Sequence, residues 1–264
     1  MNIVDIIIPV WNEENYIKDC LNSVISFELP KEIEVNIYLV DGGSTDNTLN
    51  MIQSFLDRHS NISLIHNKKR IQSCALNLAL KEGKGDYVMR LDAHTIYPND
   101  YLKNLYETST RVGAENVGGT LETLPGSNSY GAALVQAIST SVFGVGNSGF
   151  RVGSMERSVD TVPFGFFRKS IFNQIGQFNE SLVRAQDYEF NQRIIKSGGT
   201  IWINPKITAT YYNQPSLIAF LKKIFFKEAP YNSYMWYVAP YSFSLRHSIT
   251  LFFVLGLFCG LFLS

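Results

Sequence analysis

Residues 3–13 read IVDIIIPVWNE, an apolar and largely β-branched run that ends in polar side chains. A run of this kind without strict alternation predicts a strand that is buried on both faces of a parallel sheet. Similar runs follow in the first hundred residues, separated by amphipathic helical patterns; the predicted strands are 3–10, 35–40, 62–65 and 87–91, and the predicted helices are 14–27, 45–59 and 71–82. This alternation predicts an α/β fold with helices on both faces of the sheet.

Polar residues collect where three of the predicted strands end. Residues 9–13 (PVWNE) close the first strand, residues 41–44 (DGGS) follow the second, and residues 92–94 (DAH) follow the fourth. Ligands of parallel sheets bind outside the carboxyl ends of the strands, so a nucleotide is expected at this edge. There the Asp41 carboxylate could accept a hydrogen bond from a base or ribose, and Gly43 would let the backbone approach closely. A plain strand-to-helix turn with an N-cap is the alternative for this segment.

Asp92 and His94 lie two residues apart, directly after the fourth predicted strand. In an extended segment the side chains of residues i and i+2 share a face, so this carboxylate and imidazole could bind one cation. The oxygen ligand suits Mg²⁺ or Mn²⁺, and the imidazole favours Mn²⁺. Such an ion would bind a diphosphate. Taken alone the triplet is a weak signal, because the same spacing occurs in loops that bind nothing.

The composition sets limits on fold and partners. The chain has 264 residues, of which 45% are hydrophobic and 17% charged, which is enough for a large core. Its 23 basic and 23 acidic side chains give a net charge of zero, so no global field indicates a nucleic-acid partner. The cysteines show no metal or disulfide spacing and fit a reducing compartment; they are Cys20, Cys74 and Cys259. The N-terminal residues show no signal-peptide pattern.

The end of the sequence differs from the rest. Residues 248–263 read SITLFFVLGLFCGLFL, an uncharged run somewhat shorter than the roughly 20 residues of a membrane-spanning helix. Before it, residues 214–247 combine apolar side chains at helical spacing with lysines and aromatic residues. We expect an amphipathic interfacial segment at 214–247 and the start of a transmembrane helix at 248–264, which would place the preceding domain at the cytoplasmic face of the cell membrane. Packing of both segments on the domain itself is the alternative.

Motifs along the chain, taken in order, resemble those of the inverting nucleotide-sugar glycosyltransferases of family two. The resemblance covers residues 3–213, and within the family the succinoglycan-type glucosyltransferases of exopolysaccharide assembly are the most similar. The matching segments are 6–14 (IIIPVWNEE), 40–46 (VDGGSTD), 92–95 (DAHT), 162–169 (VPFGFFRK), 176–180 (GQFNE) and 184–190 (RAQDYEF).

The resemblance implies a single nucleotide-binding domain of the GT-A type, with a mixed, mostly parallel sheet, over residues 1–213. Residues 1–95 would form the nucleotide-binding half and residues 96–213 the acceptor half. The implied activity is transfer of one sugar, with inversion, from a UDP-sugar donor to a saccharide or lipid-linked saccharide, assisted by Mn²⁺ or Mg²⁺. UDP-glucose is the expected donor, from the subfamily likeness.

The resemblance also assigns residues. Asp41 corresponds to the acid that contacts uracil, Asp92 and His94 correspond to the metal-binding DxD motif, and Asp187 corresponds to the general base. The positions implied to bind the donor are Pro9, Asn12, Glu13, Asp41, Gly43, Arg70 and Asp92.

This sequence departs from the family pattern in three places. His94 replaces the usual second aspartate of the metal motif, which leaves the metal preference open. Gln186 replaces the acid that normally precedes the general base. Residues 222–236 contain no QxxRW-like motif of processive synthases, which favours transfer of a single sugar. Glu189 is expected to pair with Arg193 at i+4 rather than act as the base.

Other interpretations are possible. A nucleotidyltransferase would also use strand-end acids and a divalent ion, but it should carry a basic phosphate-binding loop near its first strand, and none is present. If Asp187 is only a dipole-stabilising acid at a helix N-terminus, the protein could be a non-catalytic, membrane-associated nucleotide-sugar-binding protein. Residues 144–149 (GVGNSG) are interpreted as a flexible loop on the acceptor side, because neither a preceding strand nor GK[ST] accompanies them.

Overall fold

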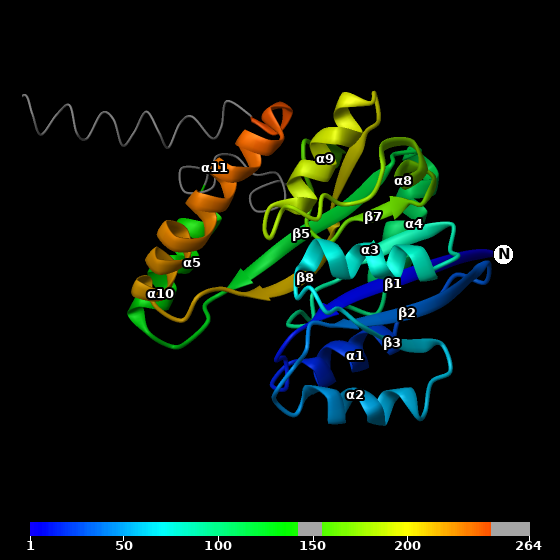
Figure 1. Ribbon diagram of the computed structural model, residues 1–264, viewed down its shortest axis with the longest axis horizontal. Coiled ribbons are helices and arrows are strands. Elements are labelled where there is room, and N and C mark those ends of the chain that lie inside the picture. Colours follow the sequence, from blue (N-terminus) through cyan, green and yellow to red (C-terminus); the bar gives the residue numbers. More distant parts are fainter. Residues whose placement is uncertain (142–154, 244–264) are drawn as a thin grey trace, which may run out of the picture.

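The computed structural model describes residues 1–141 and 155–243. These residues form an eight-stranded mixed sheet with helices packed on it (Figure 1). The strand order is β3-β2-β1-β4-β7-β5-β8-β6. The predicted acceptor-side loop at 144–149 and the predicted start of a transmembrane helix at 248–264 lie outside the described residues. Within those residues, no helix is long and apolar enough to span a bilayer.

The four strands predicted in the first hundred residues are all present and parallel. β1 pairs with β2 and with β4, and β2 pairs with β3. Their bounds are β1 Asn2–Val10, β2 Ile33–Asp41, β3 Ile62–His66 and β4 Tyr87–Arg90. The three predicted helices are present too, as α1 Ile17–Ile25, α2 Thr48–Leu56 and α3 Gln72–Glu82.

The second half of the sheet mixes strand directions. The short strand β7 pairs antiparallel with both β4 and β5, whereas β5 and β8 run parallel. The bounds are β5 Asn116–Leu124, β6 Arg157–Ser158, β7 Phe166–Arg168 and β8 Ile201–Tyr212, with the helices α4 Tyr101–Val112, α5 Tyr130–Thr140, α8 Ser170–Ile175 and α9 Gln186–Lys196. The sheet is therefore mostly parallel and mixed, as the family resemblance implies.

Helices cover both faces of the sheet. Along β1, Ile6 and Ile8 pack with α1, α2 and α4 on one face, and Ile7 packs with α3, α8 and α9 on the other. All three isoleucines are fully buried, which is why the strand shows no polar alternation. Figure 1 shows α1 and α2 below the sheet and α3, α8 and α9 above it. On the α9 face, a cluster of phenylalanines fixes the helix: Phe167, Phe172, Phe178 and Phe190.

A continuous helical segment follows β8, beyond the C-terminal ends of β5 and β8. It comprises α10 Leu217–Lys223, the π-helical turn η1 Ile224–Glu228 and α11 Ala229–Val238, and the short 3-10 turn Pro240–Ser242 comes after it. α10 packs beside α5, as Figure 1 shows at the far end of β5 and β8. This arrangement brings residues of the C-terminal helical segment, 217–238, to the edge of the sheet where the site lies.

Candidate active site

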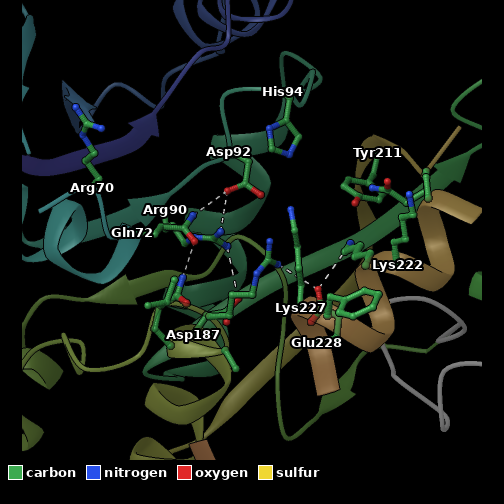
Figure 2. Close-up of a pocket in the computed structure, with 18 residues that line it drawn as sticks. Arg70, Gln72, Arg90, Asp92, His94, Asp187, Tyr211, Lys222, Lys227 and Glu228 are labelled. Atoms are coloured by element: carbon green, nitrogen blue, oxygen red, sulfur yellow. Dashed lines mark hydrogen bonds and ion pairs between the residues drawn. The ribbon is translucent and has the colours of Figure 1, made fainter. Parts of the chain in front are cut away.

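Two adjoining cavities open at the carboxyl ends of the parallel strands. The larger has a volume of about 990 Å³ and is lined by residues after β4, by the start of α9 and by the C-terminal helical segment (Figure 2). The smaller, of about 310 Å³, is lined by the ends of β1 and β2. The residues that line both cavities are Arg70, Gln72, Asp92, His94 and Arg184.

The predicted nucleoside-binding residues fall into two groups. Pro9 and Glu13 line the smaller cavity, whereas Asn12, Asp41 and Gly43 lie in the turns around it. Asn12 has a positive φ of 54°, which asparagine tolerates better than most residues. Its side-chain oxygen accepts the N–H of Thr45 at 2.8 Å and so connects the turn after β1 to the turn after β2. Nucleotide contact by this residue stays a prediction.

The Asp41 carboxylate is buried and shapes the turn after β2. It accepts the N–H groups of Gly43 and Ser44 at 2.9 and 3.0 Å. Gly43 has a φ of +82°, and a Cβ there would lie 3.4 Å from the guanidinium of Arg70. This segment therefore forms a tight turn, but the expected N-cap in it is wrong, because α2 begins after Asn47 and has no side-chain capping bond. Contact between Asp41 and a base stays a prediction.

Arg90 forms ion pairs with Asp92 and Asp187, two of the carboxylates that line the larger cavity. Its guanidinium is buried and lies 2.7 Å from Asp92 Oδ1 and 3.6 Å from Asp187 Oδ2. Burial alone would lower the pKa of this arginine, but the neighbouring carboxylates of Asp92 and Asp187 outweigh that effect and raise it. The charged guanidinium therefore holds Asp92 and Asp187 on one wall of the larger cavity. This role was not predicted from the sequence, although Arg90 is a charged residue in an otherwise apolar strand.

The donor set at Asp92 and His94 fits a divalent cation. Asp92 accepts from Arg90 and, at 3.4 Å, from Gln72 through the same oxygen, Oδ1. His94 Nδ1 lies 3.0 Å from Glu13 Oε1, a bond that raises the pKa of His94 despite its burial. A carboxylate on one imidazole nitrogen orients the ring so that the other can bind a metal. No group of three His, Cys, Asp or Glu residues clusters in the described part of the chain, so phosphates and water would complete the coordination.

Asp187 lies in the first turn of α9, as the helical pattern predicted. The helix begins after Ala185, which has a positive φ of 60°, so the Asp187 side chain lies at the positive end of the helix dipole. Its Oδ1 accepts the N–H of Tyr188 at 2.9 Å, and about a third of the side chain is exposed to the larger cavity. The predicted pair of Glu189 and Arg193 is confirmed at 2.7 Å.

Gln186, which stands where the resemblance implies an acid, is buried and its amide points toward Gln72 and Asp92. Its Nε2 donates to Gln72 Oε1 at 2.6 Å, and Gln72 in turn donates to Asp92. An amide therefore stands at this position as one member of a hydrogen-bond chain from α9 to Asp92. Figure 2 shows Gln72, Arg90, Asp92 and Asp187 gathered on the same side of the cavity.

Solved structures with the same fold include complexes with nucleotides and nucleotide sugars. The chain superimposes on S. aureus TarS 1-349 in complex with UDP with a TM-score of 0.62, at 21% identity, over 81% of this chain and 61% of that one. A mannosyltransferase from Pyrobaculum calidifontis in complex with GDP-Man and Mn²⁺ gives a TM-score of 0.60 at 19% identity, over 79% of this chain and 56% of that one. These likenesses establish the fold.

Curated relatives are more similar in sequence. One is the dolichyl N-acetyl-alpha-D-glucosaminyl phosphate 3-beta-D-2,3-diacetamido-2,3-dideoxy-beta-D-glucuronosyltransferase of Methanococcus voltae, 34% identical over 231 residues, which are 84% of this chain and 71% of the relative. Another is the succinoglycan biosynthesis protein ExoA of Rhizobium meliloti (strain 1021), 31% identical over 215 residues, which are 81% of this chain and 64% of the relative. The chain thus spans about two thirds of these relatives.

The family comparison agrees with the motifs found in the sequence. Residues 5–176 match the family described as Glycosyl transferase family 2, a span that contains both turns after β1 and β2 and the Asp92-Ala93-His94 segment. The resemblance stated from those motifs is therefore confirmed, and this chain belongs to glycosyl transferase family 2.

Proposed function

We propose that the protein is an inverting glycosyltransferase that moves one sugar from a nucleotide-diphosphate donor to a saccharide or lipid-linked saccharide. The observation that carries this proposal is the placement of Asp92 and Asp187 on one cavity wall by Arg90. A donor diphosphate at Asp92 and His94 and an acceptor hydroxyl at Asp187 could then meet inside one cavity. The neighbour bound to UDP supports a UDP-sugar as the donor class, and UDP-glucose is the donor proposed within it from the subfamily likeness in sequence.

The proposed reaction is a single displacement. The acceptor hydroxyl attacks the anomeric carbon, a new C–O bond forms, and the bond to the diphosphate breaks on the opposite face of the sugar. Asp187 takes the hydroxyl proton as that bond forms, a role that contributes about 10²- to 10⁴-fold in rate. A divalent cation held by Asp92 and His94 would stabilise the negative charge on the leaving diphosphate.

The acceptor and the location of the protein belong to the same proposal. The name of the M. voltae relative describes a dolichyl-phosphate-linked sugar, which supports a lipid-linked saccharide acceptor. In the C-terminal helical segment, the exposed apolar side chains of Ile218 and Phe225 stand beside lysines, which supports binding at the cytoplasmic face of a membrane. Flotation with anionic phospholipid vesicles tests this placement; a chain recovered only in the vesicle-free fraction would contradict it.

The Asp187→Asn variant tests the catalytic assignment. The substitution preserves shape but removes the carboxylate that accepts the proton, so we expect kcat to fall by about 10²-fold or more while the affinity for UDP-glucose with Mn²⁺ changes little. Calorimetric titration with a panel of nucleotide sugars, with and without Mn²⁺, and a transfer assay measure the two quantities.

Asp57→Asn is the matched control, because Asp57 caps the end of α2, away from both cavities. Full transfer activity in the Asp187→Asn variant would refute the base assignment. A folded wild-type chain that binds none of the nucleotide sugars would favour a non-catalytic role instead.

A further inference from the structure

We propose that Lys222 and Lys227 form a binding site for the phosphate of a lipid-phosphate-linked acceptor, separate from the site of the donor diphosphate. The proposal deepens the proposed function and rests on it, because the phosphate belongs to the acceptor of the transfer reaction. The argument uses the charges that line the larger cavity, the position of the lysines relative to the smaller cavity, and the apolar side chains beside them.

The larger cavity contains more positive than negative side chains. Six guanidinium or ammonium groups line it against three carboxylates: Arg70, Arg90, Arg184, Lys222, Lys223 and Lys227 against Asp92, Asp187 and Glu228. This excess is local, because the whole chain has no net charge. A cavity with such an imbalance and low-dielectric walls attracts anions.

Some of these cationic side chains form ion pairs with carboxylates, and others form none. Arg90 pairs with Asp92 and Asp187, while Glu228 lies 3.1 Å from Arg184 and 4.0 Å from Lys223. No hydrogen bond or ion pair of the Arg70, Lys222 or Lys227 side chains is present among residues 1–141 and 155–243. These three cations are therefore available to a ligand.

The three unpaired cations, Arg70, Lys222 and Lys227, lie in different parts of the two cavities. Arg70 lines both cavities and packs over the turn after β2, which is the side proposed for the donor. Lys222 and Lys227 line only the larger cavity, which also contains Asp187, the residue proposed to contact the acceptor hydroxyl. Figure 2 shows both lysines on the C-terminal helical segment, across the cavity from Asp92 and Asp187. Their position therefore favours an anionic group on the acceptor.

The backbone around Lys227 supports a ligand-binding role. Residues 224–228 form a π-helical turn between α10 and α11, and Phe226, Lys227 and Glu228 of this turn all line the cavity. Pro230, in the first turn of α11, has no N–H for a helical hydrogen bond, so the regular α-helical pattern is already interrupted nearby. Single π-helical turns within helices occur frequently at functional sites.

Apolar side chains beside the lysines indicate a lipid phosphate rather than a soluble one. Phe226 lines the cavity with 76% of its surface exposed, and Phe225 and Ile218 on the same helical segment are 66% and 68% exposed. Ammonium groups bind phosphate through charge-assisted hydrogen bonds, and exposed aromatic and aliphatic side chains favour contact with a hydrocarbon chain. A prenyl-type phosphate carries both chemical groups.

Calorimetric titration of the full chain with farnesyl phosphate and with farnesol, in the presence and absence of UDP and Mn²⁺, tests the proposal. We expect farnesyl phosphate to bind more tightly than farnesol. In the double variant Lys222→Gln and Lys227→Gln, its Kd should rise tenfold or more while the Kd of UDP with Mn²⁺ changes by less than twofold. The double variant Lys18→Gln and Lys31→Gln is the matched control, because it removes the same charge from exposed positions that line neither cavity.

Three outcomes would overturn the proposal. Equal affinity of the wild type for farnesyl phosphate and farnesol would show that the phosphate is not recognised. An equal loss of UDP affinity in the lysine variant would assign the lysines to the donor diphosphate. Loss of binding to phosphatidylglycerol vesicles with unchanged affinity for farnesyl phosphate would assign them to membrane headgroups. A wild type that binds farnesyl phosphate through these lysines but no nucleotide sugar would refute the proposed transferase function and leave the phosphate site standing.

Discussion

At the scale of single residues, backbone strain marks the site. The non-glycine residues with positive φ in the described part of the chain are Asn12, Arg70, Phe164 and Ala185. Asn12 and Arg70 lie in the turns at the smaller cavity, Ala185 precedes Asp187, and the ring of Phe164 lies under the Arg90 guanidinium at 5.8 Å. Positive φ is costly for such residues and persists only where the surroundings impose it, which is common around active sites.

Arg90→Lys tests whether Arg90 positions both carboxylates. A lysine retains the charge but its single ammonium cannot reproduce the two-sided contact of a guanidinium, so Asp92 and Asp187 should lose their fixed positions. We expect kcat to fall by about 10- to 100-fold, a larger change than the rise in donor KM, because a small misplacement of catalytic groups is costly. Steady-state kinetics against the donor measure this split.

Arg58→Lys is the matched control, because Arg58 also lies over a phenylalanine ring, that of Phe55, but outside both cavities. A thermal melt of each variant separates lost positioning from lost folding, since breaking a buried ion pair is itself destabilising. Arg90→Lys with kcat within twofold of the wild type would contradict the positioning role.

The site residues differ in how far the sequence could reveal them. The places of Asp92 and His94 after a strand and of Asp187 at a helix start were predictable from the sequence pattern, whereas the roles proposed for them came from the family resemblance. The role of Arg90 was not predictable, because its partner Asp187 lies in the other half of the chain and only the tertiary fold brings the two side chains together. The same holds for the link from Gln186 to Gln72, since amide pairs leave no periodic signal.

At the scale of elements, burial decides which strands can be predicted. β1 and β4 were predictable because they are largely buried and consist of apolar runs, and β2 and β3 were predictable from their β-branched and apolar residues although they are partly exposed. β6 and β7 contain only two and three residues, too few for a pattern, and they pair antiparallel with strands from elsewhere in the chain. The mixed character of the sheet was therefore implied by the resemblance and not by periodicity.

Gly119→Ala tests the close approach of β5 and β8. The pairing of these strands shifts register between Gly118 and Thr120, and a Cβ on Gly119 would lie 2.0 Å from the backbone oxygen of Ile207. Because backbone atoms cannot move aside cheaply, we expect the variant to lose about 1–3 kcal/mol of unfolding free energy, as measured by urea denaturation. Gly131→Ala, where the nearest atom is 3.4 Å away, is the control and should be tolerated.

At the scale of the whole molecule, the net charge of the sequence does not reveal the excess of positive charge around the larger cavity. The net charge of the whole chain is zero, yet six cationic side chains line one cavity of the folded chain. They come from the turn after β3, from β4, from the loop before α9 and from the C-terminal helical segment, so the six cations belong to segments that lie far apart in the sequence. Only the tertiary fold brings these segments together, and the chemistry of the cavity follows from that arrangement.

The proposed donor site predicts how ligands change the stability of the whole domain. A ligand that binds only the folded state stabilises it by about 2.7 kcal/mol at a concentration 100-fold above its Kd. For a chain of this size that corresponds to a rise in Tm of about 5–10 °C. We expect UDP with Mn²⁺ to produce such a shift in the wild type, EDTA to abolish most of it, and Asp92→Ala to show little shift because the cation loses its carboxylate.

Differential scanning fluorimetry with UDP, Mn²⁺ and EDTA measures these shifts. Asp86→Ala is the control, because Asp86 precedes β4 at the end of the sheet opposite the active-site cavities and should retain the full ligand-induced shift even if its baseline Tm falls. An equal shift in the wild type with and without EDTA would show that UDP binds without a cation and would contradict the proposed role of Asp92 and His94, because a carboxylate alone repels a diphosphate. The Arg70 guanidinium, which lines both cavities, would then be the group left to neutralise it.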